Sequence, residues 1–344
     1  MQKKVLITGA SGFVAEHLIP QFRKKGWFIY GTDRQDSPSV KCDVFKSIDL
    51  NDLKGADLEG ESFDLVIHLA AARADWGVTD EEYFRDNVDA SRALIEALKE
   101  IEVKKVIFVS SISVMPQDTN ECLEEDAPYA PINAYGFSKR DAEYLFLDYH
   151  KEFEFDLSII RPTVLYGPSN PEKTGIYRAV DNNIFRLIDG IYSKRFAILG
   201  DGKTIKTTAY VKNFTDAIIF SAENTKGYEL YVYADYPPTF MVDLVKLIRS
   251  NLGKTGTGPR LPFKMIMNFS IIFDLFSKYT KINLPINQSR IKTFVRPTNF
   301  RPGNYIKKGF KQKYTTDKAI EETVEWYLDL KQKYDHNFFL FKEK

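Results

Sequence analysis

The stretch Thr8-Gly9-Ala10-Ser11-Gly12-Phe13-Val14-Ala15 decides the fold of this 344-residue chain. It follows a short apolar run at residues 4–8 and opens a segment, residues 12–23, whose apolar residues recur at helical spacing. A glycine-rich turn between a strand and a helix predicts a dinucleotide site, although an ordinary turn is the alternative for the motif alone. Gly9 allows the tight turn, Gly12 lets backbone amides approach a pyrophosphate, and Ala15 lets the helix pack closely on the strand. We expect the helix N-terminus to face the phosphates and five loop residues to bind the cofactor: Gly9, Ser11, Gly12, Phe13 and Val14.

The end of the next predicted strand, residues 27–32, supports this site. Asp33 follows it, and a carboxylate there can accept hydrogen bonds from the adenosine ribose hydroxyls and would repel a 2′-phosphate, which favours NAD over NADP. Arg34 comes next and could neutralise such a phosphate, so NADP is the alternative cofactor. Asp43 and its neighbour Val44 could reach the adenine, although a surface turn explains Asp43 equally well.

Apolar strands alternate with longer amphipathic segments through the first half of the chain. Further strands are expected at residues 65–69, 106–109 and 157–160, and helices around 90–98 and at 135–149. This alternation predicts an α/β fold, a Rossmann-type doubly wound parallel sheet with helices on both faces. Leu69, Ala70 and Ala71 end one strand where small residues would leave room for the cofactor, whereas packing is the better interpretation of His68.

The pattern loosens after Pro162, which ends the last of these strands. Residues 182–191 and 240–252 look helical, and residues 253–262 form a stretch rich in glycine and proline. We predict an NAD(P)-binding domain over residues 1–166, joined by about 203–235. Residues 167–202 and 236–344 are expected to form a smaller C-terminal substrate-binding lobe.

The composition excludes several classes of protein. A net charge of +1 gives no reason to expect nucleic acid as a partner. Two distant cysteines and four histidines without ligand spacing support neither a disulfide framework nor a metal site, which fits a cytoplasmic protein. The apolar stretch at residues 263–276 is shorter than the ~20 residues that a membrane-spanning helix needs. We interpret it as a core or subunit-contact helix, with a membrane-surface or lipid-facing helix as the alternative, and expect no membrane partner.

The reactive centre is predicted at Tyr135 and Lys139. Their spacing places both side chains on one face of a helix, where the ammonium and a cationic nicotinamide ring would stabilise a phenolate. Tyr135 could then move a proton to or from an alcohol oxygen during hydride transfer, and Lys139 could also hold the nicotinamide ribose. A solvated helix face is the common alternative for this spacing taken alone.

A serine cluster, residues 110–113, ends the strand at 106–109. By strand alternation Ser111 and Ser113 share one face, while Ser110 points the other way. A hydroxyl near Tyr135 could orient the substrate oxygen and share its developing charge. A polar strand terminus is the alternative.

Together these elements resemble the extended short-chain dehydrogenase/reductase family, most closely its NAD-dependent nucleotide-sugar epimerase and dehydratase proteins. The resembling residues are Gly9, Gly12, Ala15, Asp33, His68 to Ala71, Asn87, Ser110, Ser111, Tyr135, Lys139, Arg161, Pro162 and Tyr166 to Pro168. The resemblance implies that Ser111 and Tyr135 are catalytic and that Lys139 acts with them and binds the cofactor. It also implies that Asn87 shapes the active-site region and that Asn87, Ser110 and Pro162 contact the cofactor.

Residues 199–211 resemble the Gly-Asp-Gly segment of nucleotide-sugar epimerases and dehydratases, in which an arginine commonly contacts the substrate diphosphate. This chain has Lys206 at that position, which keeps the charge but loses the bidentate fork. The predicted substrate-binding residues are Ser111, Ser113, Tyr135, Asn170, Lys203 and Lys206.

Four functions compete. The first is a nucleotide-sugar epimerase that uses transient hydride transfer to NAD, and the second is a nucleotide-sugar ketoreductase or dehydrogenase. The third is a hydroxysteroid-dehydrogenase-like enzyme, and the fourth is a non-catalytic dinucleotide-binding protein. Family dehydratases carry Asp-Glu after the catalytic hydroxyl, where this chain has Ile112 and Ser113, so dehydration is disfavoured.

A homodimer is also expected, because proteins of this resemblance often pair through a four-helix contact. The two helices expected at residues 83–100 and 135–150 would form it. Leu145, Phe146 and Tyr149 are examples of their apolar residues beyond the face that covers the sheet.

Overall fold

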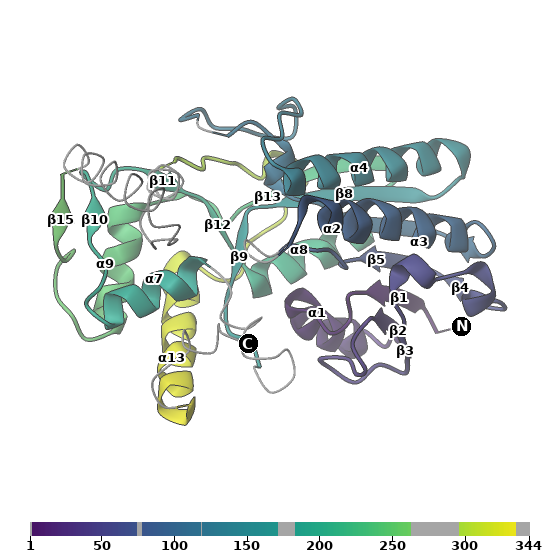
Figure 1. Cartoon of the computed structure of the whole chain (residues 1–344), viewed down its shortest axis with the longest axis horizontal. Coiled ribbons are helices and arrows are strands. Elements are labelled where there is room, and N and C mark those ends of the chain that lie inside the picture. The colour runs from purple at the N-terminus through teal and green to yellow at the C-terminus, as the bar shows by residue number, and fades with distance from the viewer. Residues whose placement is uncertain (1, 74–77, 118, 171–182, 263–295, 335–344) are drawn as a thin grey trace, which may run out of the picture.

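The computed structural model describes residues 2–73, 78–117, 119–170, 183–262 and 296–334. Its centre is a seven-stranded sheet in the order β13-β8-β7-β5-β1-β2-β3, and all neighbouring strands are parallel (Figure 1). The strands are β1 (Lys4–Thr8), β2 (Phe28–Asp33), β3 (Val44–Ser47), β5 (Leu65–His68), β7 (Lys105–Val109), β8 (Asp156–Pro162) and β13 (Tyr228–Tyr233). The predicted α/β fold with a Rossmann-like parallel sheet is therefore confirmed.

Helices cover both faces of this sheet (Figure 1). One face carries α1 (Phe13–Lys24) and α8 (Val211–Asn224), and the other carries α2 (Asp80–Phe84), α3 (Ala90–Leu98) and α4 (Ala134–Glu152). Successive residues of β1 enter opposite layers: Val5 and Ile7 pack with α1, and Leu6 packs in the layer of α3 and α4. This alternation explains why the strands read as continuous apolar runs.

A smaller lobe lies beside the carboxyl ends of the strands (Figure 1). Its core joins three helices, α7 (Asn183–Tyr192), α9 (Met241–Asn251) and α13 (Thr316–Tyr334), and includes the buried Tyr166 and Tyr210. Three strand pairs stand outside the large sheet near this lobe: β9 (Val164–Tyr166) with β12 (Thr208–Tyr210), β10 (Ile198–Leu199) with β15 (Arg260–Leu261), and β11 (Ile205–Lys206) with β14 (Thr239–Phe240). The predicted helices at 182–191 and 240–252 correspond to α7 and α9.

Shorter elements complete the described chain. They are η1 (Leu50–Asp52), η2 (Gly55–Leu58), the π-helical turn η3 (Arg85–Asp89), η4 (Ile112–Val114), α12 (Gly303–Lys307) and the pair β4 (Ser62–Phe63) with β6 (Glu102–Val103). The expected continuous helix at 83–100 is thus divided, because η3 separates α2 from α3. The apolar stretch at 263–276 lies outside the described residues.

The outer surface of α4 differs from the prediction for a dimer contact. Phe146 and Tyr149 belong to the core on the sheet side, at 0% and 4% exposure, because they follow the buried face of the helix. The exposed apolar residues of α4 are instead Phe137 and Tyr144, and the Arg140 guanidinium lies over both rings. No described helix is long and apolar enough to cross a membrane.

Candidate active site

The glycine loop joins β1 to α1 at the carboxyl edge of the sheet. Gly9 has a φ of 69°, and a Cβ there would lie 2.8 Å from the backbone nitrogen of Ala70. Gly12 is the N-cap of α1 and donates its N–H to the Gly9 carbonyl at 2.9 Å. The ends of β1 and β5 therefore approach so closely that only glycine fits at residue 9, and they leave a cradle of backbone suited to a dinucleotide phosphate.

Asp33 stands beside this loop. Its carboxylate accepts the Ser11 N–H at 3.0 Å and the Gln35 N–H at 3.1 Å. The predicted ribose acceptor therefore lies next to the phosphate cradle. The Arg34 guanidinium is paired with Asp86 at 3.1 Å. The Asp86 carboxylate would therefore compete with a 2′-phosphate for binding to Arg34.

The structure places Asp43 and Val44 at the amino end of a strand that the sequence analysis did not recognise. Val44 begins β3 opposite Tyr30, and the Asp43 carboxylate accepts the Ile29 N–H at 2.8 Å. Both residues are therefore about four residues or ~13 Å from the edge where the glycine loop lies. This position does not favour the expected adenine contact, which stays a prediction.

Asp49 follows β3 at the carboxyl edge of the sheet, the edge where the glycine loop lies, and the sequence analysis did not single it out. Its carboxylate caps η1 by accepting both the backbone N–H and the side-chain amide of Asn51, at 3.0 and 2.9 Å. Partial burial would raise the pKa of Asp49, but these hydrogen bonds and the charges of Arg34 and Arg85 outweigh it and lower the pKa. The β-branched and aromatic residues of the short segment 44–48 are only a weak sequence signal for a strand that ends before Asp49.

The strand end at β5 is held from two sides. Leu69 and Ala70 donate their backbone N–H groups to the carbonyl and hydroxyl oxygens of Thr8, each at 3.3 Å. His68 contacts the same Thr8 hydroxyl at 2.7 Å, and complete burial lowers its pKa to about 3. His68 is thus a neutral packing residue beneath the site. Ala71 follows at the exposed rim of this segment.

Asn87 connects this segment to the helix that carries Tyr135 and Lys139. Its side-chain oxygen accepts the Ala72 N–H at 2.8 Å, and its amide donates to the Ala72 carbonyl at 3.1 Å and to the Ser138 hydroxyl at 2.9 Å. Asn87 is 1% exposed and lies in the π-helical turn, a distortion that is frequent at functional sites. The side chain therefore shapes the site by bridging two segments.

Helix α4 begins at Asn133, whose side chain accepts the Gly136 N–H at 2.8 Å. Tyr135 lies in the first turn, with its ring 5.7 Å from the ring of Tyr83. Lys139 lies one turn later and donates to the Val109 carbonyl at 2.8 Å. The helical spacing that was predicted for Tyr135 and Lys139 is therefore present at the end of β7.

Lys139 occupies an unusual environment for an ammonium group. Its side chain is 1% exposed and its nitrogen lies 4.3 Å from the centre of the Phe108 ring. Burial lowers the pKa of Lys139 to about 7, and the charge of Glu143 opposes that shift. A group with this pKa can change its charge in the neutral range, which is typical of functional sites.

Ser111 and Ser113 are adjacent for a reason other than strand alternation. Strand β7 ends at Val109, and Ser111 is the N-cap of η4, where its hydroxyl oxygen accepts the Ser113 N–H at 3.1 Å and the two hydroxyls are 3.1 Å apart. A Cβ on Gly136 would overlap the Ser113 carbonyl oxygen. The first turn of α4, which carries Tyr135, thus packs directly on the serine turn.

Ser110 points away from the surface of the site. Its hydroxyl donates to Glu143, and its backbone N–H donates to the Ile160 carbonyl at 2.7 Å. The residue is 3% exposed, and its expected contact with the cofactor stays a prediction. Pro162 is buried at the end of β8, next to Arg161, which also binds Glu143.

The predicted substrate residues lie on several segments. The Asn170 N–H and the Ser169 hydroxyl donate to Glu16 of α1 at 2.7 and 2.8 Å, so this loop is anchored beside the glycine loop. Lys206 directs its ammonium to the Arg296 carbonyl, and Lys203 is exposed. The structure therefore gives Lys206 a backbone partner in the smaller lobe and leaves its role toward a diphosphate as a prediction.

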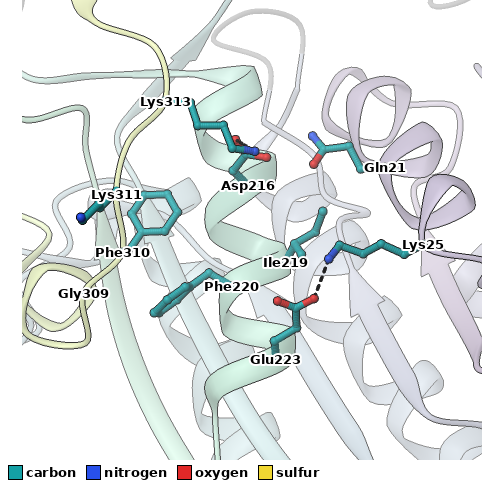
Figure 2. A pocket seen from close by; sticks show the side chains of 10 residues that line it. All are labelled: Gln21, Lys25, Asp216, Ile219, Phe220, Glu223, Gly309, Phe310, Lys311 and Lys313. Carbon is teal, nitrogen blue, oxygen red and sulfur yellow. Dashed lines mark hydrogen bonds and ion pairs between the residues drawn. The ribbon is translucent and has the colours of Figure 1, made fainter.

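A shallow cavity of about 290 Å³ lies away from these residues, between α1, α8 and residues 309–313 (Figure 2). Lys25, which follows α1, pairs with Glu223 of α8 across it at 2.7 Å, and Lys313 pairs with Asp216 at 2.9 Å. None of the predicted cofactor or substrate residues lines this cavity. No cluster of metal-ligating side chains occurs in the part of the chain that the structure describes.

Comparison with known proteins agrees with this geometry. Residues 5–233 match the NAD dependent epimerase/dehydratase family. The chain is 30% identical over 329 residues to the N-acetyl-alpha-D-glucosaminyl-diphospho-ditrans,octacis-undecaprenol 4-epimerase of Escherichia coli, which covers 95% of this chain and 96% of that protein. The structure of UDP-glucose 4-epimerase from Thermotoga maritima with UDP-glucose aligns with a TM-score of 0.73 at 18% identity, over 95% of this chain and 99% of that one. The UDP-glucuronic acid 4-epimerase from Bacillus cereus in complex with NAD aligns with a TM-score of 0.69 at 20% identity, over 97% and 99%.

Proposed function

The chain belongs to the NAD-dependent epimerase/dehydratase family and uses NAD, and from this premise we propose that it is a 4-epimerase of a hexose carried on a diphosphate. One observation carries the proposal: Tyr135 and Lys139 occupy the first turns of α4, at the point where α4 packs on the turn of Ser111. In this proposal Tyr135 is the acid/base, Lys139 the cation and Ser111 the orienting hydroxyl, and their common location beside the end of β7 supports it.

Each residue then has a distinct role. Bound NAD supplies the hydride acceptor for oxidation of the sugar carbon and the donor for its reduction. Tyr135 takes the proton from the sugar hydroxyl and returns it later, and the Lys139 ammonium favours the phenolate that this requires. Ser111 donates a hydrogen bond to the sugar oxygen. Gly9, Gly12 and Asp33 hold the phosphates and the adenosine ribose.

Epimerisation is favoured over net reduction because the relative that is 30% identical over 95% of this chain is an epimerase. Dehydration is disfavoured because Ile112 and Ser113 stand where family dehydratases carry the acidic pair. The test incubates the purified protein with UDP-glucose and UDP-N-acetylglucosamine in deuterated water and follows both C4 epimers by NMR. A product that retains hydrogen at C4, with no net change in NADH absorbance, supports the epimerase. A stoichiometric change in NADH would show a reductase or dehydrogenase instead.

The group that carries the sugar diphosphate differs between two versions of the proposed function. A nucleotide is the first candidate, as in the UDP-sugar epimerases of the same fold. A polyprenyl diphosphate is the second, because the relative that matches 95% of the chain acts on an undecaprenyl-linked sugar. The two share the sugar diphosphate, so the test compares UDP-N-acetylglucosamine with N-acetylglucosaminyl-diphospho-polyprenol in detergent. The carrier with the higher kcat/KM identifies the version.

Lys203 and Lys206 are proposed to bind the diphosphate in either version. Lys206→Ala should raise KM more than it lowers kcat, because a contact remote from the reacting carbon contributes largely uniform binding. The exposed Lys203→Ala is the companion variant. Unchanged KM in both variants would restrict the segment to a structural role.

We also propose that the protein is a homodimer, with Phe137 and Tyr144 of α4 in the contact. Both rings are exposed, at 37% and 45%, on the helix face opposite the sheet. Light scattering should give twice the chain mass of 39.6 kDa, and Tyr144→Asp should shift the protein toward the single mass. A single-chain mass for the unmodified protein at micromolar concentration would contradict the dimer.

A further inference from the structure

A carboxylate with no solvent exposure lies directly beneath the candidate active site. Glu143 of α4 accepts two hydrogen bonds from Arg161 of β8, at 3.0 Å from Nε and 2.7 Å from Nη2. It also accepts the Tyr129 hydroxyl at 2.6 Å and the Ser110 hydroxyl. Each carboxylate oxygen therefore has two donors, which fills the acceptor capacity of the group.

The ion pair between Glu143 and Arg161 is buried from solvent. The Glu143 and Arg161 side chains are 0% and 2% exposed, and the Arg161 guanidinium lies 4.6 Å from the centre of the Tyr129 ring. A buried pair of this kind is weak as a source of net stability, because desolvation offsets most of its attraction. Four hydrogen bonds from three other segments of the chain converge on Glu143, and holding these segments in a fixed geometry explains this arrangement better than a gain in stability.

Two neighbouring residues at the end of β7 connect Glu143 to the predicted reactive residues. The Val109 carbonyl accepts the Lys139 ammonium at 2.8 Å, and the next residue, Ser110, donates its hydroxyl to Glu143. Lys139 and Glu143 are one helical turn apart on α4, and both are buried. Helix α4 lies along β8 (Figure 1). The strand end is thus tied to the helix twice, immediately before Ser111.

We propose that Glu143, held by Arg161, is a positioning residue for the epimerisation, an inference that rests on the proposed function. Through Ser110 it fixes the distance and angle of the Ser111 hydroxyl relative to Tyr135. Its negative charge also keeps the proton on Lys139. Glu143 acts only through these residues, because its own carboxylate is enclosed and cannot touch a substrate.

The charge effect has a definite direction. Burial lowers the pKa of Lys139, and the Glu143 carboxylate opposes this. Of the other groups that face Lys139, His68 is neutral because burial lowers its pKa to about 3, and Tyr135 lies one turn away on the same helix. Glu143 is therefore the anion that favours the charged form of Lys139 among the described neighbours.

The geometric part is tested with Ser110→Ala, which removes one hydroxyl and leaves the ion pair intact. We expect kcat to fall about tenfold, since small displacements of an orienting group are costly, while KM and the Kd for NADH stay within about twofold. The matched control is Ser158→Ala on the adjacent strand, which removes a buried hydroxyl that binds Thr225 at 2.8 Å. The control should lower Tm to a similar degree and leave kcat unchanged. Equal kcat values in the two variants would overturn the proposal.

The charge part is tested with Glu143→Gln, or with Glu143→Gln and Arg161→Gln together if the single variant does not fold. Loss of the anion should let Lys139 release its proton at lower pH, so the alkaline limb of the kcat profile should move to lower pH. A folded variant with an unmoved limb would contradict this part. Tyr135→Phe distinguishes failure of the proposed function from failure of the role of Glu143. Normal turnover in Tyr135→Phe would contradict the proposed function. An inactive Tyr135→Phe together with normal turnover in Ser110→Ala would contradict only the positioning role of Glu143.

Discussion

Lys139 donates its buried ammonium to the carbonyl oxygen of Val109 at 2.8 Å, which ties the helix of the reactive centre to the end of the central strand β7. The same ammonium lies over the ring of Phe108, one residue earlier on that strand. A flexible lysine is thereby held in one conformation against the last residues of β7. The cost of this arrangement is the burial of a cation.

The burial of this cation leads to a prediction for Lys139→Met, which keeps a long, unbranched side chain and removes its charge. The pKa of Lys139 in the folded protein is about 7, below its usual 10.5, so the folded state binds fewer protons than the unfolded state between these values. This group therefore makes stability rise with pH across that window and fall as pH drops toward 7. Lys139→Met should flatten the rise in urea-unfolding curves, abolish turnover and weaken NADH binding. A wild-type slope in the variant would contradict the buried charge.

Gly9→Ala tests the phosphate cradle. The added methyl would lie 2.8 Å from the Ala70 nitrogen, so the glycine loop and the end of β5 would have to separate. We expect the Kd for NADH to rise at least about tenfold and Tm to fall. Gly26→Ala is the matched control, because Gly26 has a similar positive φ of 78° but nothing within 4 Å of an added Cβ. It should show the left-handed strain of about 1–2 kcal/mol and normal NADH affinity.

The choice between NAD and NADP depends on two carboxylates. Asp33 opposes a 2′-phosphate, and Asp86 holds the Arg34 guanidinium at 3.1 Å. The unmodified protein should bind NADH more tightly than NADPH in fluorescence titrations. Asp86→Asn should improve NADPH binding by releasing Arg34, and Asp33→Asn should improve it further by removing the repulsion. Tighter NADPH binding by the unmodified protein would show that Arg34 leaves Asp86 to clamp the phosphate.

We expect opposite effects on NADH binding from substitution of two aspartates near β3, Asp49 and Asp43. Asp49 follows the carboxyl end of β3, so Asp49→Ala should weaken NADH binding if this carboxylate contacts the adenosine, as we propose. Asp43 lies at the amino end and accepts the Ile29 N–H at 2.8 Å, so Asp43→Ala should lower Tm without changing the Kd. Isothermal titration and thermal melts measure both quantities. The reverse pattern would restore Asp43 as the adenine contact.

This pair also shows how far the sequence predicts the molecule. Features that depend on local order were predictable: the turn at Gly9, the strand–helix alternation and the helical spacing of Tyr135 and Lys139. The position of Asp43 at the amino end of β3 was not predictable, because it depends on the register of β3 against β2, which is set by pairing between segments and not by local composition. A strand of four partly exposed residues gives a weak local signal.

The polar contacts beneath the site were not predictable for the same reason. The Glu143–Arg161 pair joins a helix to a strand, and nothing in either local sequence marks the partner. The hydrogen bond from the Ser110 hydroxyl to Glu143 was likewise not predicted, and the cofactor contact expected of Ser110 stays a prediction. The adjacency of Ser111 and Ser113 was foreseen, but it arises from the 3₁₀ turn η4 and not from an extended strand.

Tyr135→Phe is the variant that decides the chemistry. It removes only the phenolic hydroxyl, so the tilted ring contact with Tyr83 and the first turn of α4 should remain, and the variant should fold and bind NADH normally. Turnover should fall roughly 10²–10⁴-fold, the usual contribution of a positioned proton-transfer group. Tyr144→Phe is the control, since it removes a hydroxyl from the outer face of the same helix, where the side chain is 45% exposed. Ser111→Ala should cost less than Tyr135→Phe, because the Ser113 hydroxyl lies only 3.1 Å from that of Ser111 and can partly replace it. Near-normal turnover in Tyr135→Phe would leave a dinucleotide-binding fold whose proton transfer is performed by another group.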